Sequence, residues 1–252
     1  MRKRDILCLI CVIVSIILIT RVWAAIPSGP TITYAGNETS SASGNPTLEN
    51  NNSITGGVIA TLILNARQAD SHWKAYVGNV TGTYVLEDAS NYSIYEWNIT
   101  SIAGEVYATR TSSTINWSGT RCANVTHVNQ EMTEMHHNTT NTPGDSINET
   151  FDDNANDHWG FYSGSTQITQ NTCNYSIQTW VNDTAQSSTE WFEEVLLYDG
   201  SLNLIYVTKI ENNIDGYKND AANTTYDFQM LIAENGSPAT SHTDYYFYVE
   251  LS

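Results

Sequence analysis

The chain has few basic residues, little cysteine and little proline. Its 252 residues contain 10 Lys plus Arg against 27 Asp plus Glu, for a formal net charge of -17, with only 4 Cys and 5 Pro. The shortage of Lys and Arg excludes nucleic acid as a partner, because affinity for the phosphate backbone comes mainly from basic side chains that displace condensed counterions. Charged residues make up only 15 % of the chain, so its solubility depends on neutral polar side chains.

Long apolar runs are also scarce, and the main one lies at the amino terminus. A basic start at residues 2–4 precedes an almost continuous apolar stretch at residues 6–20, and Val22 and Ala24 stand three and one positions before a cleavage point. This arrangement is typical of a secretory signal peptide. A retained membrane anchor is the alternative, but about 15 apolar residues fall short of the roughly 20 that span a bilayer. We therefore predict that residues 1–24 are a signal peptide and that the secreted mature protein has no stable membrane span.

Two cysteines, Cys122 and Cys173, remain after removal of the signal peptide, which also leaves 6 basic and 26 acidic residues. In an exported chain two cysteines most simply form one disulfide. It would close a loop of about 50 residues and stabilise the fold by about 3 to 4 kcal/mol through its effect on the unfolded chain. A pair of buried thiols is the alternative.

Sites for N-glycosylation are the strongest signal in the sequence. The chain contains 13 N-x-S/T sequons, more than twice the number that random placement of its 26 Asn and 54 Ser plus Thr would produce. In an exported chain this excess predicts covalent N-glycans over much of the surface. The predicted acceptors are Asn37, Asn51, Asn79, Asn91, Asn98, Asn116, Asn124, Asn138, Asn148, Asn174, Asn182, Asn223 and Asn235.

The expected strands place some of these acceptors on a solvent-facing side. Side chains alternate between the two faces of a strand, so Tyr95 and Trp97 share one face while Asn98 lies on the other. By the same reasoning Asn174 and Ser176 share a polar face farther along the chain. We expect glycans at these positions to point into water.

From residue 57 onward, runs of β-branched and aromatic residues predict a succession of strands. Their spacing indicates an all-β fold, an antiparallel β-sandwich of Ig-like or jelly-roll-like type. Asp199-Gly200 between two apolar runs predicts a hairpin, and both runs are apolar on both faces, so a second sheet or a neighbouring subunit should cover them. The expected strands are 58–64, 73–77, 83–87, 93–99, 104–109, 174–181, 192–198, 203–210, 226–233 and 244–251.

Residues 122–164 depart from this pattern. Residues 128–135 are the best helix candidate, and a polar, acidic stretch follows. We interpret the region as a long insertion tethered by the Cys122–Cys173 disulfide, either functional or loosely ordered.

One short stretch of this insertion resembles the start of a calcium-binding loop, with oxygen-bearing side chains at Asp152, Asn154, Asn156 and Asp157. The sixth position lacks the turn-making Gly and the twelfth lacks the bidentate Glu, so it is not an EF-hand. We expect no cofactor and no metal. A looser calcium site there, or near residues 215–220, is the alternative to a solvated acidic loop.

Catalytic motifs are absent from the sequence, which contains no G-x-S-x-G elbow, H-E-x-x-H pair or P-loop. The adjacent carboxylates Glu193 and Glu194 should point to opposite faces of a strand and cannot both serve one cleft. We predict that the protein is not an enzyme, with a secreted hydrolase as a minor alternative.

Residues 25–56 contain many Ser, Thr, Asn, Gly and Pro residues and too few apolar ones to fold alone. Within them Thr31, Ile32, Thr33 and Tyr34 alternate like a short strand. We interpret residues 25–56 as a flexible segment that carries a candidate donor strand, followed by a glycosylated β-sandwich domain at 57–252. A disordered spacer is the alternative.

Six runs of the sequence form a specific pattern: Trp73–Gly82, Leu86–Ser90, Tyr95–Trp97, Gly104–Ala108, Tyr226–Gly236 and Tyr245–Leu251. Together they resemble a family of exported, sequon-rich archaeal proteins of small-genome lineages. The resemblance covers most of residues 57–251; it implies an archaeal cell-surface setting and brings no catalytic residues. More loosely, the order of signal peptide, isolated strand and glycosylated β domain is similar to archaeal threads and pili assembled by donor-strand exchange.

A sandwich that lacks one strand would expose unpaired backbone groups and an apolar floor, and an extended segment from a neighbour could satisfy both. Ile32 and Tyr34 would fill the pockets. Because donor and groove are different surfaces, the contact is head-to-tail and builds an open homopolymer of identical subunits. We therefore predict a structural subunit of an extracellular, heavily N-glycosylated filament. The alternative is a monomeric or anchored cell-surface adhesin that binds glycans or a partner cell through exposed aromatics such as Trp180 and Trp191.

Overall fold

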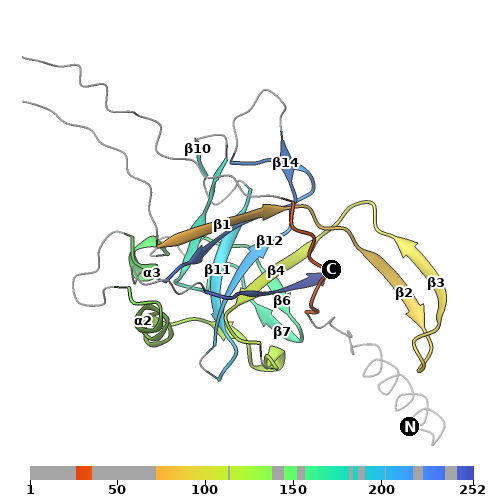
Figure 1. Ribbon diagram of the computed structural model, residues 1–252, viewed down its shortest axis with the longest axis horizontal. Helices are drawn as coiled ribbons and strands as arrows, with labels where there is room; N and C mark the ends of the chain where they lie inside the picture. The colour runs from red at the N-terminus through yellow and green to blue at the C-terminus, as the bar shows by residue number, and fades with distance from the viewer. Residues whose placement is uncertain are drawn as a thin grey trace, which may run out of the picture.

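The computed structural model confirms the predicted all-β class (Figure 1). It describes residues 27–35, 72–112, 114–137, 145–151, 157–181, 184–186, 191–201, 203–217, 224–235 and 243–252. The described residues do not include the predicted signal peptide, most of residues 25–56 or the strand expected at 58–64. Within these ranges every strand pairing is antiparallel.

A six-stranded sheet forms the centre of the molecule. Its middle strands β4, β12 and β11 are aligned so that Val207 lies opposite both Tyr107 and Val195. These three side chains are buried on one face of the sheet, and their neighbours Tyr206, Ala108 and Leu196 are buried on the other face, which confirms that both faces of these strands are covered. The strands in spatial order are β16 (Tyr246–Leu251), β4 (Gly104–Thr109), β12 (Leu204–Lys209), β11 (Glu193–Tyr198) and β5 (Arg121–Cys122), with β8 (Ser176–Gln178) also on β11.

One face of this sheet lies against a second layer, which gives the predicted sandwich. That layer contains the strand pair β1 (Trp73–Gly78) and β15 (Phe228–Ala233) together with helices α2 (Val125–Glu134) and α3 (Ile147–Thr150). Apolar side chains of both layers form one core, among them Leu196 and Tyr206 of the central sheet and Ile232 of β15. Burial of this apolar surface is the main source of the stability of the fold.

The opposite face is covered by part of the insertion. The Cys122–Cys173 disulfide is formed, and Cys173 lies in a second buried cluster with Phe161 and Ile168. These two residues belong to the hairpin of β6 (Phe161–Ser163) and β7 (Thr166–Ile168). The short 3-10 helix η1 (Trp117–Gly119) lies earlier in the chain, before β5. The covering of both faces therefore comes from the same chain.

The described parts of the insertion are well packed, so the expectation of a loosely ordered region is wrong for them. Met132, Met135 and Phe151 are at most 1 % exposed and belong to the main core. Helix α2 also begins three residues earlier than predicted, because the side chain Oδ1 of Asn124 accepts hydrogen bonds from the backbone N–H groups of Thr126 and His127. This cap satisfies two donors at the helix start.

The strand expected at 174–181 is divided into β8 and β9 (Trp180–Val181), and β9 pairs with β10 (Thr184–Ala185). Ser176 lies opposite Val195 of β11 and is fully buried. The predicted polar face at Ser176 is therefore wrong, because β8 lies under the insertion. A further strand pair consists of β13 (Ile214–Asp215) and β14 (Thr225–Tyr226).

Candidate functional site: an open sheet edge and an exposed hairpin

Among the described residues, the central sheet has an incompletely paired edge at β16. One side of β16 pairs with β4, while on the other side the backbone of Val249 exchanges two hydrogen bonds with Ser28, of 3.0 and 2.8 Å. Since both polar groups of Val249 point away from β4, strand alternation directs those of Phe247 and Leu251 the same way. Ser28 is the one described residue that pairs with this side of β16.

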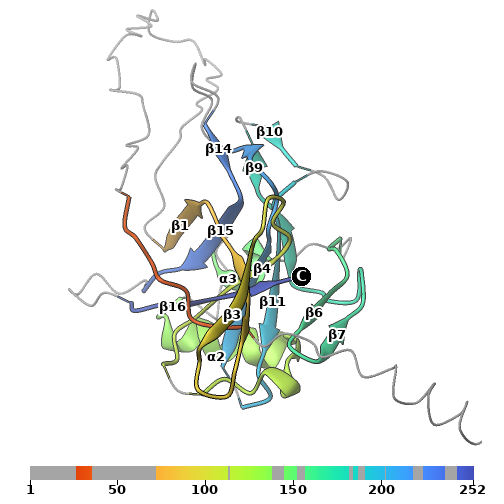
Figure 2. The same cartoon turned by 90° about the vertical axis from the view of Figure 1, so that its right-hand side faces the viewer.

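The predicted donor residues continue from this single bridge. Residues 27–35 cross the surface beside β16, drawn orange-red in Figure 2. Ile32 is 65 % exposed and Tyr34 is 74 % exposed. Thr31 to Tyr34 have no strand partner among the described residues. The predicted donor segment therefore has its apolar side chains in water and its backbone unpaired by any described strand.

A second exposed feature is the hairpin of β2 (Thr83–Glu87) and β3 (Ser93–Asn98), which we call the arm. It projects away from the two layers of the body, to the right in Figure 1 and toward the viewer in Figure 2. Neither of its strands pairs with any other strand in the described part of the chain. An isolated two-stranded hairpin is marginally stable in water at best.

The arm has one aromatic face. Tyr84 lies opposite Trp97 and Leu86 lies opposite Tyr95, and residues opposite one another share a face. We call these four side chains the aromatic face of the arm; they are 47 to 57 % exposed. The rings of Tyr95 and Trp97 lie 4.6 Å apart, centroid to centroid. The predicted alternation at residues 95–98 is confirmed.

The opposite face of the arm, which we call its polar face, carries Asn98, which lies opposite Thr83, and Glu96, which lies opposite Val85; alternation also places Ile94, which is 71 % exposed, on this face. Residues 79–109 include no Lys or Arg, and residues 27–35 carry no charged side chain at all. The arm carries the acidic residues Glu87, Asp88 and Glu96, but the four side chains of its aromatic face are uncharged, as is the donor segment.

The structure describes eight of the predicted glycan acceptors. Asn148 and Asn235 are half-buried. The side-chain oxygen Oδ1 of Asn148 accepts a hydrogen bond of 3.1 Å from the hydroxyl of Tyr175. The amide nitrogen, to which a glycan would attach, takes no part in that bond. Asn37, Asn51, Asn138, Asn182 and Asn223 lie outside the described residues. The exposed acceptors are Asn79, Asn91, Asn98, Asn116, Asn124 and Asn174.

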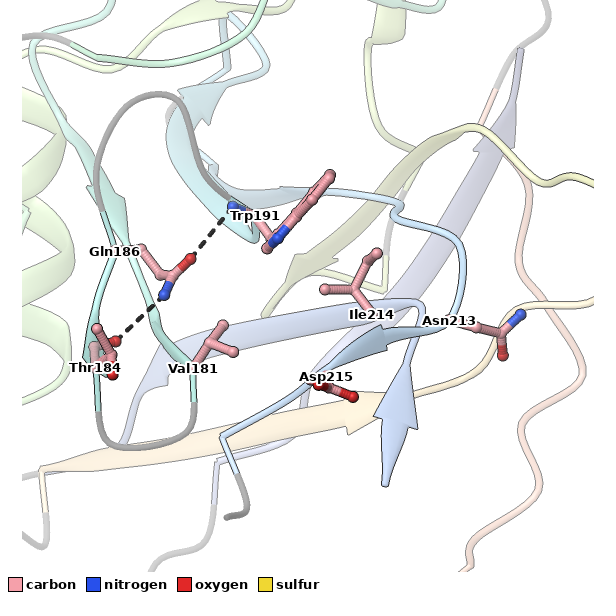
Figure 3. A pocket seen from close by; sticks show the side chains of 7 residues that line it. All are labelled: Val181, Thr184, Gln186, Trp191, Asn213, Ile214 and Asp215. Carbon is pink, nitrogen blue, oxygen red and sulfur yellow. Dashed lines mark hydrogen bonds between the residues drawn. The ribbon is translucent and has the colours of Figure 1, made fainter. Parts of the chain in front are cut away.

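An open hollow of about 470 Å³ lies between two of the short strand pairs (Figure 3). The β9–β10 pair, with Thr184 and Gln186 at its end, forms one wall, and β13 forms another. The side-chain amide of Gln186 donates to the carbonyl of Thr184 and accepts from the backbone N–H of Trp191. Trp191 and Trp180 are exposed as predicted, but only Trp191 lines the hollow. The lining residues are Val181, Thr184, Gln186, Trp191, Asn213, Ile214 and Asp215.

The calcium candidates Asp152, Asn154 and Asn156 lie outside the described residues. Asp157 is described, and its backbone carbonyl accepts a 2.7 Å hydrogen bond from the side chain of Gln178. Within the described ranges no group of three or more His, Cys, Asp or Glu side chains could hold a metal ion.

The sequence alone did not predict the row of buried carboxylates that crosses the central sheet. Glu105 of β4 lies opposite Glu250 of β16 on one side and opposite Lys209 of β12 on the other. Trp159, from the insertion, donates its indole N–H to Glu105 at 3.2 Å and its backbone N–H to Glu193 of β11 at 2.6 Å. The row therefore attaches the insertion to the sheet through charge-assisted hydrogen bonds.

Burial is the main cause of the raised pKa values of these carboxyl groups. It raises the pKa of Glu105 to about 7, helped by the nearby charge of Glu250, and it also raises the pKa of Glu193 and of Glu250. On the other face of β11, Glu194 accepts a 2.8 Å hydrogen bond from the backbone N–H of Leu231. Complete burial raises its pKa as well. Glu193 and Glu194 thus point to opposite faces, as predicted.

The described residues define an all-β sandwich with one internal disulfide, an incompletely paired sheet edge and a hairpin that no other described strand supports. Comparison of the chain with family models, with curated proteins and with solved structures gives no match. The resemblance to archaeal surface proteins therefore stays a prediction. Among the described helices, none combines the length and apolar character needed to cross a membrane.

Proposed function

We propose that the protein is a structural subunit of an extracellular, N-glycosylated filament in which each copy donates residues 31–34 to an unpaired strand of the next copy. The observation that carries this proposal is the exposure of Ile32 and Tyr34 on a segment that no described strand pairs with, in a chain whose described strands also include open edges. Strand addition would satisfy the backbone of donor and acceptor at once and bury both side chains.

The energetics favour a contact made through neutral surfaces. Burying an Ile and a Tyr contributes on the order of 3 to 6 kcal/mol before the cost of association. Mature copies, with 6 basic and 26 acidic residues, each carry a net charge of about -20 and repel one another, and the uncharged segment 27–35 avoids placing further charge in the contact. Donor and acceptor are different surfaces, so the assembly grows head-to-tail without closing.

Glycosylation and location are part of the proposal. Six of the described sequon asparagines are exposed, which supports a glycan coat on the outside of the filament. The sequence resemblance supports an archaeal cell surface as its setting.

The test compares two matched double substitutions in the full chain purified from its secreting host. Ile32→Ser with Tyr34→Ser removes the apolar side of the donor, while Thr31→Ser with Thr33→Ser changes the same number of residues on its polar side. We expect the wild-type chain and the threonine variant to form filaments in electron micrographs. The first variant should need a protein concentration higher by about a hundredfold or more, from the burial lost. Filaments that form equally well from both variants would refute the donor assignment.

A second candidate function is an adhesin, and the hollow beside Trp191 favours it. An indole face can stack on a sugar ring while the side chains of Gln186, Asn213 and Asp215 bind its hydroxyls. Binding of a monodisperse, non-filamentous protein to a glycan array would support this function. Loss of that binding in Trp191→Ala, with Trp180→Ala as the control outside the hollow, would locate it.

A further inference from the structure

We propose that the acceptor of the donated segment is the arm. Residues 31–34 of one copy add to the β2–β3 hairpin of the next copy as a third strand, and Ile32 and Tyr34 pack beside its aromatic face. This inference rests on the proposed strand donation and names the surface that receives the strand.

The first argument is that the arm is incomplete by itself. Four large side chains stand half-exposed on one face, and both outer edges of the hairpin lack a strand partner among the described residues. A third strand is the smallest addition that gives a hairpin with one apolar face independent stability. A tetrapeptide with two apolar side chains supplies both the backbone groups and the apolar cover that the arm lacks.

The second argument is the match in spacing. Ile32 and Tyr34 are two residues apart, as are Tyr84 and Leu86 on β2 and Tyr95 and Trp97 on β3. Residues two apart on a strand point to the same face about 6.6 to 6.8 Å from each other, and adjacent strands lie about 4.8 Å apart. A donated strand therefore sets its two apolar side chains next to a pair of the same spacing.

The polar side chains of the donor segment would also lie on the polar face of the arm. When Ile32 and Tyr34 lie on the aromatic face, Thr31 and Thr33 fall on the face of Asn98 and Glu96. That face holds the sequon asparagine, so a glycan at Asn98 would project away from the apolar contact.

The third argument is that the other open edge is less suitable. Ser28 of the same chain already occupies the Val249 position of β16. The side chains of Phe247, Val249 and Leu251 already pack against the main core, so a strand added there gains backbone hydrogen bonds but little new apolar burial. A strand donated to the arm gains both backbone hydrogen bonds and new apolar burial, which favours the arm as the acceptor.

The lack of charge on the donor segment and on the aromatic face of the arm also favours the arm as the acceptor. The aromatic face of the arm is uncharged, as is the donor segment, although each mature copy, with 6 basic and 26 acidic residues, has a net charge of about -20. A contact between these two surfaces brings copies together without placing carboxylates of one copy against carboxylates of the other.

The test uses disulfide trapping between two full-length variants that are mixed before assembly. One variant carries Thr33→Cys, and the other carries Val85→Cys or Glu96→Cys, which mark the polar face of β2 or of β3. A third partner, Tyr246→Cys, marks β16. The native Cys122–Cys173 disulfide is already closed and does not compete. We expect a covalent dimer between Thr33→Cys and at least one of the two arm variants, formed in filaments and absent under reducing conditions.

The outcomes separate this inference from the proposed function. Filaments in which Thr33→Cys links only to Tyr246→Cys would overturn the arm as acceptor while strand donation stands. A monomeric crosslink, in a chain that carries both substitutions at high dilution, would also overturn it, because the segment would then complete its own arm. A wild-type chain that forms no filament would overturn both.

A pair of substitutions on the arm gives a second readout. Tyr95→Ser with Trp97→Ser removes the two rings of the aromatic face, and Tyr92→Ser removes an aromatic ring that is 72 % exposed on the same arm but outside that face. We expect the double variant to raise the critical concentration for assembly at least about tenfold. We expect Tyr92→Ser to leave it unchanged. Circular dichroism and thermal unfolding check that the body stays folded, and an unchanged critical concentration in the double variant would overturn the inference.

Discussion

The buried carboxylate Glu105 makes the stability of the body depend on pH in a direction opposite to that of ordinary acid denaturation. Its pKa in the folded protein is about 7, whereas the ordinary value for a glutamate is 4.5, so the folded state holds its proton more tightly than the unfolded state does. The stabilising contribution of the protonated form is fully present below about pH 4.5 and is lost as the pH rises through about 7. From pH 5 to pH 8 the loss is about 2.5 kcal/mol, obtained from these two values.

The substitution Glu105→Gln isolates this effect. Glutamine has nearly the same shape and keeps an oxygen that can accept the indole N–H of Trp159, but it does not ionise. We expect the variant to match the wild-type protein in free energy of unfolding near pH 5, within about 1 kcal/mol. At pH 8 it should be more stable by about 2 to 3 kcal/mol.

Urea denaturation, followed by tryptophan fluorescence at several pH values, measures this difference. The control is Glu96→Gln, which removes the same charge from the exposed polar face of the arm and should follow the wild-type curve. If the wild-type and Glu105→Gln proteins lose stability in parallel between pH 5 and pH 8, the buried carboxylate is not the cause and the reasoning is refuted.

Two further predictions concern the insertion. Replacing Cys122 and Cys173 together by Ser should lower the free energy of unfolding by about 4 kcal/mol, because the disulfide closes a loop with a sequence separation of 51; a change below about 1 kcal/mol in urea denaturation would contradict this. Asn124→Ala should cost about 1 kcal/mol through loss of the cap of α2. Thr126→Val removes the same sequon but keeps the cap, so equal destabilisation by both substitutions would show that the cap is not responsible. Mass spectrometry of the secreted variants reports whether Asn124 carries a glycan.

The strands were largely predictable because their signal is local. The bounds of β2 and β4 are those that alternation and β-branched or aromatic residues indicate. The start of α2 was missed because its cap uses the unusual pair Asn124 and His127, in which the imidazole accepts the backbone N–H of Asn124 at 3.2 Å. A glutamate or glutamine at that position would have been the ordinary signature.

The burial pattern was harder to predict because it depends on partners far away in the chain. Glu105 and Glu250 look like the polar positions of half-exposed strands, and only Trp159 and the hairpin after it reveal that this face is covered. Conversely, Tyr95 and Trp97 alternate as core residues do, yet the arm carries them away from the body. Periodicity says which side chains share a face, but it does not say what covers that face.

The position of the disulfide has a mechanical consequence. Cys122 lies on β5 and Cys173 lies just before β8, and both strands pair with β11 along the same side. A pulling force transmitted along the chain would pass through the sulfur–sulfur bond and bypass the loop that it closes. With a sequence separation of 51, roughly 170 to 180 Å of contour length is withheld from extension. A chain pulled from its two ends would extend only by the segments outside this loop, and helices α2 and α3 and the β6–β7 hairpin would stay free of load.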